Sequence, residues 1–210
     1  MKKLTKKQIV ALSITAGVIL LWIISYACIK GAMEKQLEKL ITSQTSYPAK
    51  VDIGSDMFSI LGGNLRFVKA DIHNAAKTEY CRVILKGLKL NIKDQDKSRI
   101  KSADFDIKLS EAAFADQLIN KFKQQHLQLS NGYVYLTMNK YTVIGVLTAS
   151  GNQMYFKVVD SNSGLEASVI ESKINPIHIN QNINFRRFEY NSGYYYISGS
   201  ASNLTGLNGI

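Results

Sequence analysis

Residues 104–122 read DFDIKLSEAAFADQLINKF, and the spacing of the apolar side chains changes within this stretch. Before Ser110, apolar residues alternate with charged ones, which predicts a strand with one buried and one solvated face. Ser110 suits the N-cap position of a helix, and an apolar stripe at helical spacing follows it over residues 111–123. A strand that leads directly into a helix favours an α+β fold.

Alternating patterns recur on both sides of this stretch. Strands are expected at 68–72, 88–92, 104–109, 133–138, 141–148, 154–159, 164–171, 174–179, 184–190 and 194–200. Asn-Gly and Ser-Gly pairs between several of them tolerate the positive φ of tight turns. The pattern predicts one antiparallel meander that curls, with a helix at its start and another in its middle. Helices over the concave face of such a sheet would enclose an apolar channel.

An uncharged segment precedes this region. It runs from Ile9 to Ile29 (IVALSITAGVILLWIISYACI) and has 21 residues. As a helix it would extend about 31 Å, close to the hydrocarbon thickness of a bilayer. We interpret it as a retained transmembrane anchor. A signal peptide cleaved after Ala27 ranks second and a lipoprotein lipidated at Cys28 ranks third.

Lysines flank the uncharged segment. Five lysines before position 31 supply half of the net charge of +10. This bias predicts a cytoplasmic amino terminus in a single-pass protein of the cell membrane. The chain then divides into a Lys-rich tail with its anchor (1–30) and an extracytoplasmic domain (31–210), on the periplasmic or cell-surface side. The remaining positive charge is scattered, which argues against a nucleic-acid partner.

Residues 31–43, directly after the anchor, have apolar side chains at helical spacing and predict a short amphipathic helix.

The sequence contains no recognisable motif of catalytic or metal-binding residues. The histidines, His73, His126 and His178, are far from one another and from the cysteines, so we expect no metal site. Neither a glycine-flanked nucleophile elbow nor a Gly-rich loop at a helix start is present. We therefore expect a protein that is not an enzyme and needs no cofactor.

Residues 55–64 (SDMFSILGGN) form an apolar cluster between turn-forming residues, and the cluster looks too short for a helix. It is either a strap packed onto the sheet or a loop that contacts the membrane and gates the channel. For Ile60 and Leu61 the strap is slightly favoured. For Met57 and Phe58 we favour membrane contact, and all four are candidate residues of this loop.

Several phrases occur in a characteristic order: MFSILGGNLRFVKADI, YCRVILKGLKLNI, LSEAAFADQLI and INFRRFEYNSGYYYISGSASNL. This layout resembles that of the LmeA-like phospholipid-binding proteins, extracytoplasmic lipid binders with a fold like the tubular lipid-binding (TULIP) domains. The resemblance covers roughly residues 34–205. It implies non-enzymatic binding, or transfer, of a phospholipid or related lipid in an apolar cavity of a curved sheet, with the membrane as partner.

Apolar residues of the central strands and the middle helix are the candidate lining of such a cavity. They are Leu88, Leu90, Ile92, Phe105, Ile107, Phe114, Leu118 and Phe122. A solid core would use the same residues, and the two interpretations have even odds. The alternative function is a membrane-tethered structural or adaptor domain that binds a protein partner, whose identity stays open, through an exposed strand edge.

Overall fold

The computed structural model of the chain describes residues 6–45, 47–74, 78–91, 97–121, 126–138, 140–175, 177–178 and 182–205. The helices of this part are α1 (Lys6–Thr45), α2 (Met57–Leu61), α3 (Glu111–Lys121) and α4 (Ala167–Ile174). The strands are β1 (Ala49–Ile53), β2 (Asn64–His73), β3 (Tyr80–Lys89), β4 (Arg99–Ser110), β5 (His126–Ser130), β6 (Tyr133–Met138), β7 (Tyr141–Ser150), β8 (Gln153–Ser161), β9 (Ile177–His178), β10 (Ile183–Asn191) and β11 (Tyr194–Thr205).

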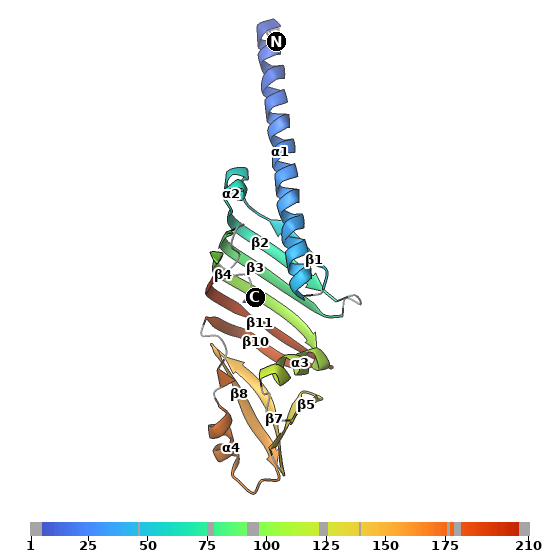
Figure 1. Cartoon of the computed structure of the whole chain (residues 1–210), viewed down its shortest axis with the longest axis vertical. Coiled ribbons are helices and arrows are strands. Elements are labelled where there is room, and N and C mark those ends of the chain that lie inside the picture. Colours follow the sequence, from blue (N-terminus) through green and yellow to red (C-terminus); the bar gives the residue numbers. More distant parts are fainter. Residues whose placement is uncertain are drawn as a thin grey trace, which may run out of the picture.

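The strands form two antiparallel sheets. Sheet A has the order β1-β2-β3-β4-β11-β10, and sheet B has the order β5-β6-β7-β8-β9. Figure 1 shows the sheets following one another along the long axis, with α1 projecting beyond sheet A. The α+β class with an apolar amino-terminal helix is confirmed. The single curved sheet was wrong, because the strands after α3 pair among themselves before the chain returns to sheet A.

The return to sheet A joins the first and last parts of the domain. β11 pairs with β4 along almost its whole length, from Tyr194 opposite Ser110 to Thr205 opposite Arg99. The strand that precedes α3 is thus held by the strand that ends the described chain. A bond from the N–H of Phe185 in β10 to the carbonyl of Gly151 links the two sheets.

Two apolar clusters fill the interior. The first lies between α1, α2 and sheet A and consists of Leu37, Val51, Ile53, Ile60, Leu65, Val68, Ala70, Val83, Leu85, Leu88, Ile100, Ala103 and Ala201. The second joins α3, α4, sheet B and the end of sheet A and consists of Phe114, Leu118, Leu127, Val134, Leu136, Val143, Met154, Phe156, Ile170, Tyr195 and Ile197. Phe105 packs against both clusters and connects them.

α1 is one continuous helix, which includes the apolar segment and the residues that follow it. Residues 31–43, for which an amphipathic helix was expected, form its carboxy-terminal part. Large apolar side chains between Val18 and Ile24 are 50 to 66% exposed. The segment Gly17–Ser43 has the length and apolar composition of a membrane-crossing helix, a property that a signal sequence shares.

Two local predictions were wrong. The apolar cluster after Asp56 does form a helix, α2, because the Asp56 carboxylate caps it by accepting bonds from the backbone N–H and the hydroxyl of Ser59 at 2.9 and 2.7 Å. The strand expected at 164–171 is replaced by α4, which buries Ile170 against sheet B.

Candidate functional site

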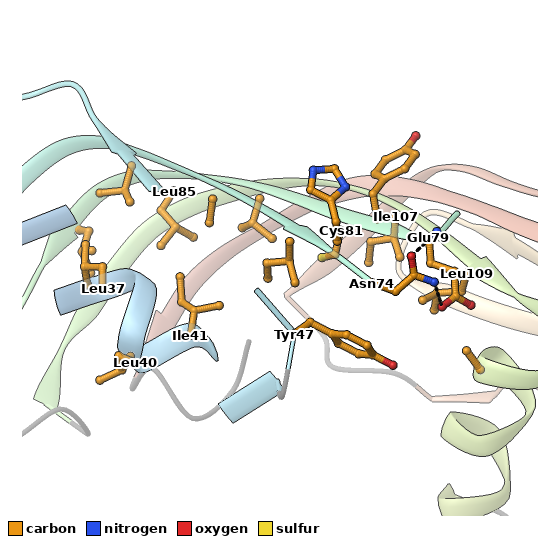
Figure 2. Close-up of a pocket in the computed structure, with 18 residues that line it drawn as sticks. Leu37, Leu40, Ile41, Tyr47, Asn74, Glu79, Cys81, Leu85, Ile107 and Leu109 are labelled. Atoms are coloured by element: carbon orange, nitrogen blue, oxygen red, sulfur yellow. Dashed lines mark hydrogen bonds between the residues drawn. The ribbon is translucent and has the colours of Figure 1, made fainter. Parts of the chain in front are cut away.

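Two helices cover separate parts of one face of sheet A. α1 ends at Thr45 and α3 begins at Glu111, and side chains of both helices border the space between them. This space is a cavity of about 450 Å³ (Figure 2). Its lining residues are Leu37, Leu40, Ile41, Tyr47, Val68, Ala70, Ile72, His73, Asn74, Glu79, Tyr80, Cys81, Val83, Leu85, Leu88, Ile107, Leu109 and Ala113.

The floor of the cavity comes from three neighbouring strands. Ile72 of β2 lies opposite Cys81 of β3, and Cys81 lies opposite Ile107 of β4. Directly opposed residues point to the same face of a sheet, so these side chains form one continuous apolar row. Burial and the charge of Asp106 raise the pKa of the Cys81 thiol to about 11, so this group is neutral at physiological pH.

The roof of the cavity comes from the last turns of α1. Leu37, Leu40 and Ile41 face the floor across the cavity, and Tyr47 borders it from the chain that follows the helix (Figure 2). Leu37 is buried, whereas Leu40 and Ile41 are half-buried. Only part of the apolar surface of this helix is therefore buried by packing against the domain, and the rest borders the cavity.

One end of the cavity is polar. Glu79 accepts a bond from the backbone N–H of Ser110 at 2.7 Å and another from the side-chain amide of Asn74 at 3.0 Å (Figure 2). The hydrogen bonds from Ser110 hold the pKa of the Glu79 carboxyl below its ordinary value despite some burial. Glu79 is thus ionised at neutral pH. The cavity combines an apolar body with one polar, negatively charged end.

The position of the roof is fixed by two glutamates of α1. Glu34 accepts a bond from the N–H of Ile53 at 2.9 Å, and Glu38 accepts one from the N–H of Val51 at 3.0 Å. β1 is the outer strand of sheet A, so these N–H groups have no neighbouring strand. The side chains of α1 supply the acceptors instead.

Two further contacts continue this arrangement toward the amino terminus of α1. The Lys30 ammonium lies 2.9 Å from a carboxylate oxygen of Asp52, and the Tyr26 hydroxyl donates to the carbonyl of Ser55 at 2.9 Å. The four contacting residues of α1 are spaced by four, so they lie along one side of the helix. The domain is consequently attached to α1 without an intervening linker.

Side chains at α4 bond to the backbone at a strand edge of sheet B in the same way. Glu171 accepts from the N–H of Val158 at 2.8 Å, and Asn175, just after the helix, exchanges bonds with both backbone groups of Phe156. These bonds occupy the edge of β8 beyond its short pairing with β9. Parts of two strand edges that an adaptor domain would need are therefore already satisfied within the chain.

The predicted lining residues separate into distinct groups. Leu88 and Ile107 line the cavity, and Leu90 is half-buried against the first cluster. Phe105 lies between the clusters. Phe114 and Leu118 are buried in the second cluster and do not line this cavity. Ile92 and Phe122 lie outside the described residues.

Sequence reasoning missed most of the lining, including the roof of α1 and the polar end. The helical spacing within residues 31–43 was a signal for the roof, because it predicted an apolar helix face without a named partner. The polar end had no comparable signal, since Asn74 and Glu79 occur in an ordinary turn-like sequence.

The candidate membrane-contact residues also separate. Phe58 and Leu61 are 76% and 59% exposed, and Met57 is half-buried. For Ile60 the strap was favoured, and its side chain is 0% exposed and belongs to the first cluster, whereas Leu61, for which the strap was also favoured, is exposed. None of the four lines the cavity, so the structure gives this segment no position from which to gate it.

Comparisons with known proteins add no relative: no protein-family model, no curated protein and no solved structure matches the chain. The geometry of the cavity and of α1 is therefore the basis for a functional assignment.

Proposed function

We propose that this protein is a membrane-anchored, non-enzymatic binder of a lipid, and that the cavity between α1 and sheet A holds one apolar chain of that lipid. The observation that carries the proposal is the mostly apolar lining from Leu37 to Leu109, with polar groups at one end. Amphiphile sites need this combination of a long apolar body and a few polar groups that orient the ligand.

The cavity volume selects among lipids. A water molecule occupies about 30 Å³ in the liquid, and a methylene group, which also has one heavy atom, is of similar size. A cavity of about 450 Å³ therefore accommodates about 15 such groups. That is enough for one acyl chain. A fatty acid, a lysophospholipid or one chain of a phospholipid would fit.

The energetics favour exchange with a bilayer over extraction into water. Removing about 15 methylene groups from an apolar environment into water costs roughly 12 kcal/mol. A chain that passes from a bilayer into this cavity avoids most of that cost, because both environments are apolar. Selectivity then depends on the polar end, where ionised Glu79 disfavours an anionic head group and suits a zwitterionic or cationic one.

α1 supports a membrane location for this exchange. Its uncharged segment from Ile9 to Ile29 is long enough to cross a bilayer, and its last turns form the roof of the cavity. A retained anchor would therefore keep the binding site close to its source of lipid. We propose that the domain lies on the extracytoplasmic side, on the basis of the lysines that precede the apolar segment.

Photocrosslinking of the full-length protein in bilayers tests the proposal. The probe is a single-chain zwitterionic lipid with a diazirine at the end of its chain, and adducts are mapped by peptide mass spectrometry. We expect adducts in β3 and in the last turns of α1. Cys81→Phe should reduce them about tenfold, since obstruction that costs 1.4 kcal/mol changes occupancy by that factor.

Ile84→Phe is the matched control, because Ile84 lies on the same strand but alternates to the opposite face of sheet A. It should leave the adducts unchanged. Adducts confined to the apolar part of α1, or equal effects of both substitutions, would contradict a lipid site in the cavity.

A further inference from the structure

We infer that α2 is a second membrane contact, whose exposed Phe58 and Leu61 enter the lipid surface beside α1. This inference rests on the anchor in the proposed function but not on the cavity. α2 would then add a second point of contact between the domain and the bilayer.

The two sides of α2 differ in exposure. Phe58 and Leu61 are three residues apart, so they lie on the same side of a helix, and they are 76% and 59% exposed. Ile60 points the opposite way and is fully buried. One buried side chain fixes the helix to the domain, and two large apolar side chains face away from it. Adjacent exposed groups of this kind are typical of contact surfaces.

α2 lies beside the apolar part of α1. The chain enters α2 directly after Ser55, whose carbonyl accepts the bond from the Tyr26 hydroxyl. Tyr26 in turn stacks on Trp22, with ring centroids 6.3 Å apart. Figure 1 shows α2 at the rim of sheet A that is nearest to the amino-terminal half of α1. Tyrosine and tryptophan are enriched where a membrane protein crosses the bilayer surface.

Charged residues next to α2 indicate where the bilayer surface lies along α1. Lys30, the first charged residue after the uncharged segment, pairs with Asp52. Tyr26 lies one helical turn, about 6 Å, closer to the apolar part, and it contacts Ser55. The segment from Asp52 to Ser55 thus runs along α1 toward its amino terminus. It makes a charged contact at Asp52 and then an aromatic contact at Ser55, just before α2 begins. This order places α2 at the boundary between water and lipid.

Local structure keeps α2 in this position. Asp56 caps its start, and the N–H groups of Gly62 and Gly63 bond to the carbonyls of Phe58 and Ile60 at its end. Because both ends are fixed and Ile60 is buried, Phe58 and Leu61 stay exposed at little entropic cost. A lipid surface needs no specific partner shape, which suits two side chains on a helix of a single turn.

Fluorescence quenching in bilayers tests this contact. Full-length protein is reconstituted into vesicles of phosphatidylcholine with brominated acyl chains. Trp22 is the native tryptophan, so the wild type reports on α1 itself. In a Trp22→Phe background, Phe58→Trp reports on α2, and Val169→Trp reports on an exposed position of α4 at the opposite end of the molecule.

We expect strong quenching in the wild type and for Phe58→Trp, with a blue-shifted emission in both, and none for Val169→Trp. Leu61→Trp should behave like Phe58→Trp. Quenching of Trp22 without quenching at position 58 would overturn the role of α2 and leave the anchor intact. Absence of quenching at both positions would overturn both.

A third outcome separates lipid from protein. If the indole at position 58 is shielded from aqueous iodide but is not quenched by brominated lipid, a protein or a second copy of the chain covers α2, and the inference is wrong. Thermal unfolding of each variant in the same vesicles verifies that the domain is folded. Neither result depends on whether the cavity holds a lipid, so failure of the α2 contact is distinguishable from failure of the lipid-binding proposal.

Discussion

The carboxylate of Glu34 in α1 accepts a hydrogen bond from the backbone N–H of Ile53 in β1, with 2.9 Å between the two atoms. Glu38, one turn later, makes the same contact with Val51. Four residues of a helix rise about 6 Å, and two residues of a strand extend about 6.8 Å. Because these two distances are similar, side chains on one side of a helix can accept bonds from alternate N–H groups of a strand edge. Glu171 and Asn175 make the same kind of contact with β8.

Removal of the Glu34 carboxylate should destabilise the domain. Glu34→Ala would remove the acceptor of the Ile53 N–H at the edge of sheet A, and only water could replace it. We expect a loss of about 1.5–3 kcal/mol, the contribution of a hydrogen bond to a charged group, and faster amide hydrogen exchange at Ile53. The exposed Gln36 gives the control, since Gln36→Ala on the same helix should change neither quantity. Unchanged exchange at Ile53 after Glu34→Ala would contradict the assignment.

The two glycines after α2 should respond differently to alanine. Gly63 has a φ of 67°, and a Cβ there would lie 2.6 Å from the carbonyl oxygen of Leu90. We expect Gly63→Ala to cost about 1–3 kcal/mol in chemical unfolding. Gly62 has a φ of −80° and a nearest contact of 3.3 Å, so Gly62→Ala should cost less than about 1 kcal/mol. Equal costs would refute this difference.

Stability should depend on pH through Glu79. Hydrogen bonds from Ser110 lower the pKa of this carboxyl from its ordinary 4.5, so its ionised form stabilises the folded state. That contribution is fully present above pH 4.5 and is lost as the pH falls through the lower folded pKa. The difference in melting temperature between wild type and Glu79→Gln should follow this course.

Cys81 should alkylate slowly in a Cys28→Ser background, where it is the remaining cysteine. Burial raises its pKa from 9.0 to about 11, which lowers the thiolate fraction at neutral pH about 100-fold. The rate with a small maleimide should rise about tenfold per pH unit between pH 7 and 9 and continue to rise beyond it. A plateau near pH 9 would show that the thiol is not in an apolar site.

Sequence patterns predicted β2, β4, β10, β11 and α3 because each buries one face against a core, but they missed β1 and placed the third strand at 88–92 instead of Tyr80–Lys89. They failed at residues 164–171, where Leu165, Ala167 and Val169 alternate as in a strand. The buried side chain is instead Ile170, on a helix that also brings Glu171 to the edge of β8. The local sequence was compatible with the spacing of a strand and with that of a helix, and the tertiary contacts of Ile170 and Glu171 favour the helix.

The cavity was predictable only in part. An apolar pattern identifies the inner face of a strand or helix but not what covers it, so Leu88 and Phe114 looked equivalent in the sequence. Both are buried in an apolar cluster, but only Leu88 also borders the cavity. The positions of α1 and α3 over the sheet determine this difference, and a pattern of residue types contains no such information.

The contacts of α1 with the domain fix a direction as well as a distance. Tyr26, Lys30, Glu34 and Glu38 all lie on one side of a helix that continues unbroken toward residue 6. One residue inserted ahead of Tyr26 would turn the apolar part by about 100° relative to the domain. The number of residues between Trp22 and Glu34 therefore fixes the rotation of the anchor about the helix axis relative to the domain. This rotation determines the side of the anchor on which the cavity and α2 lie.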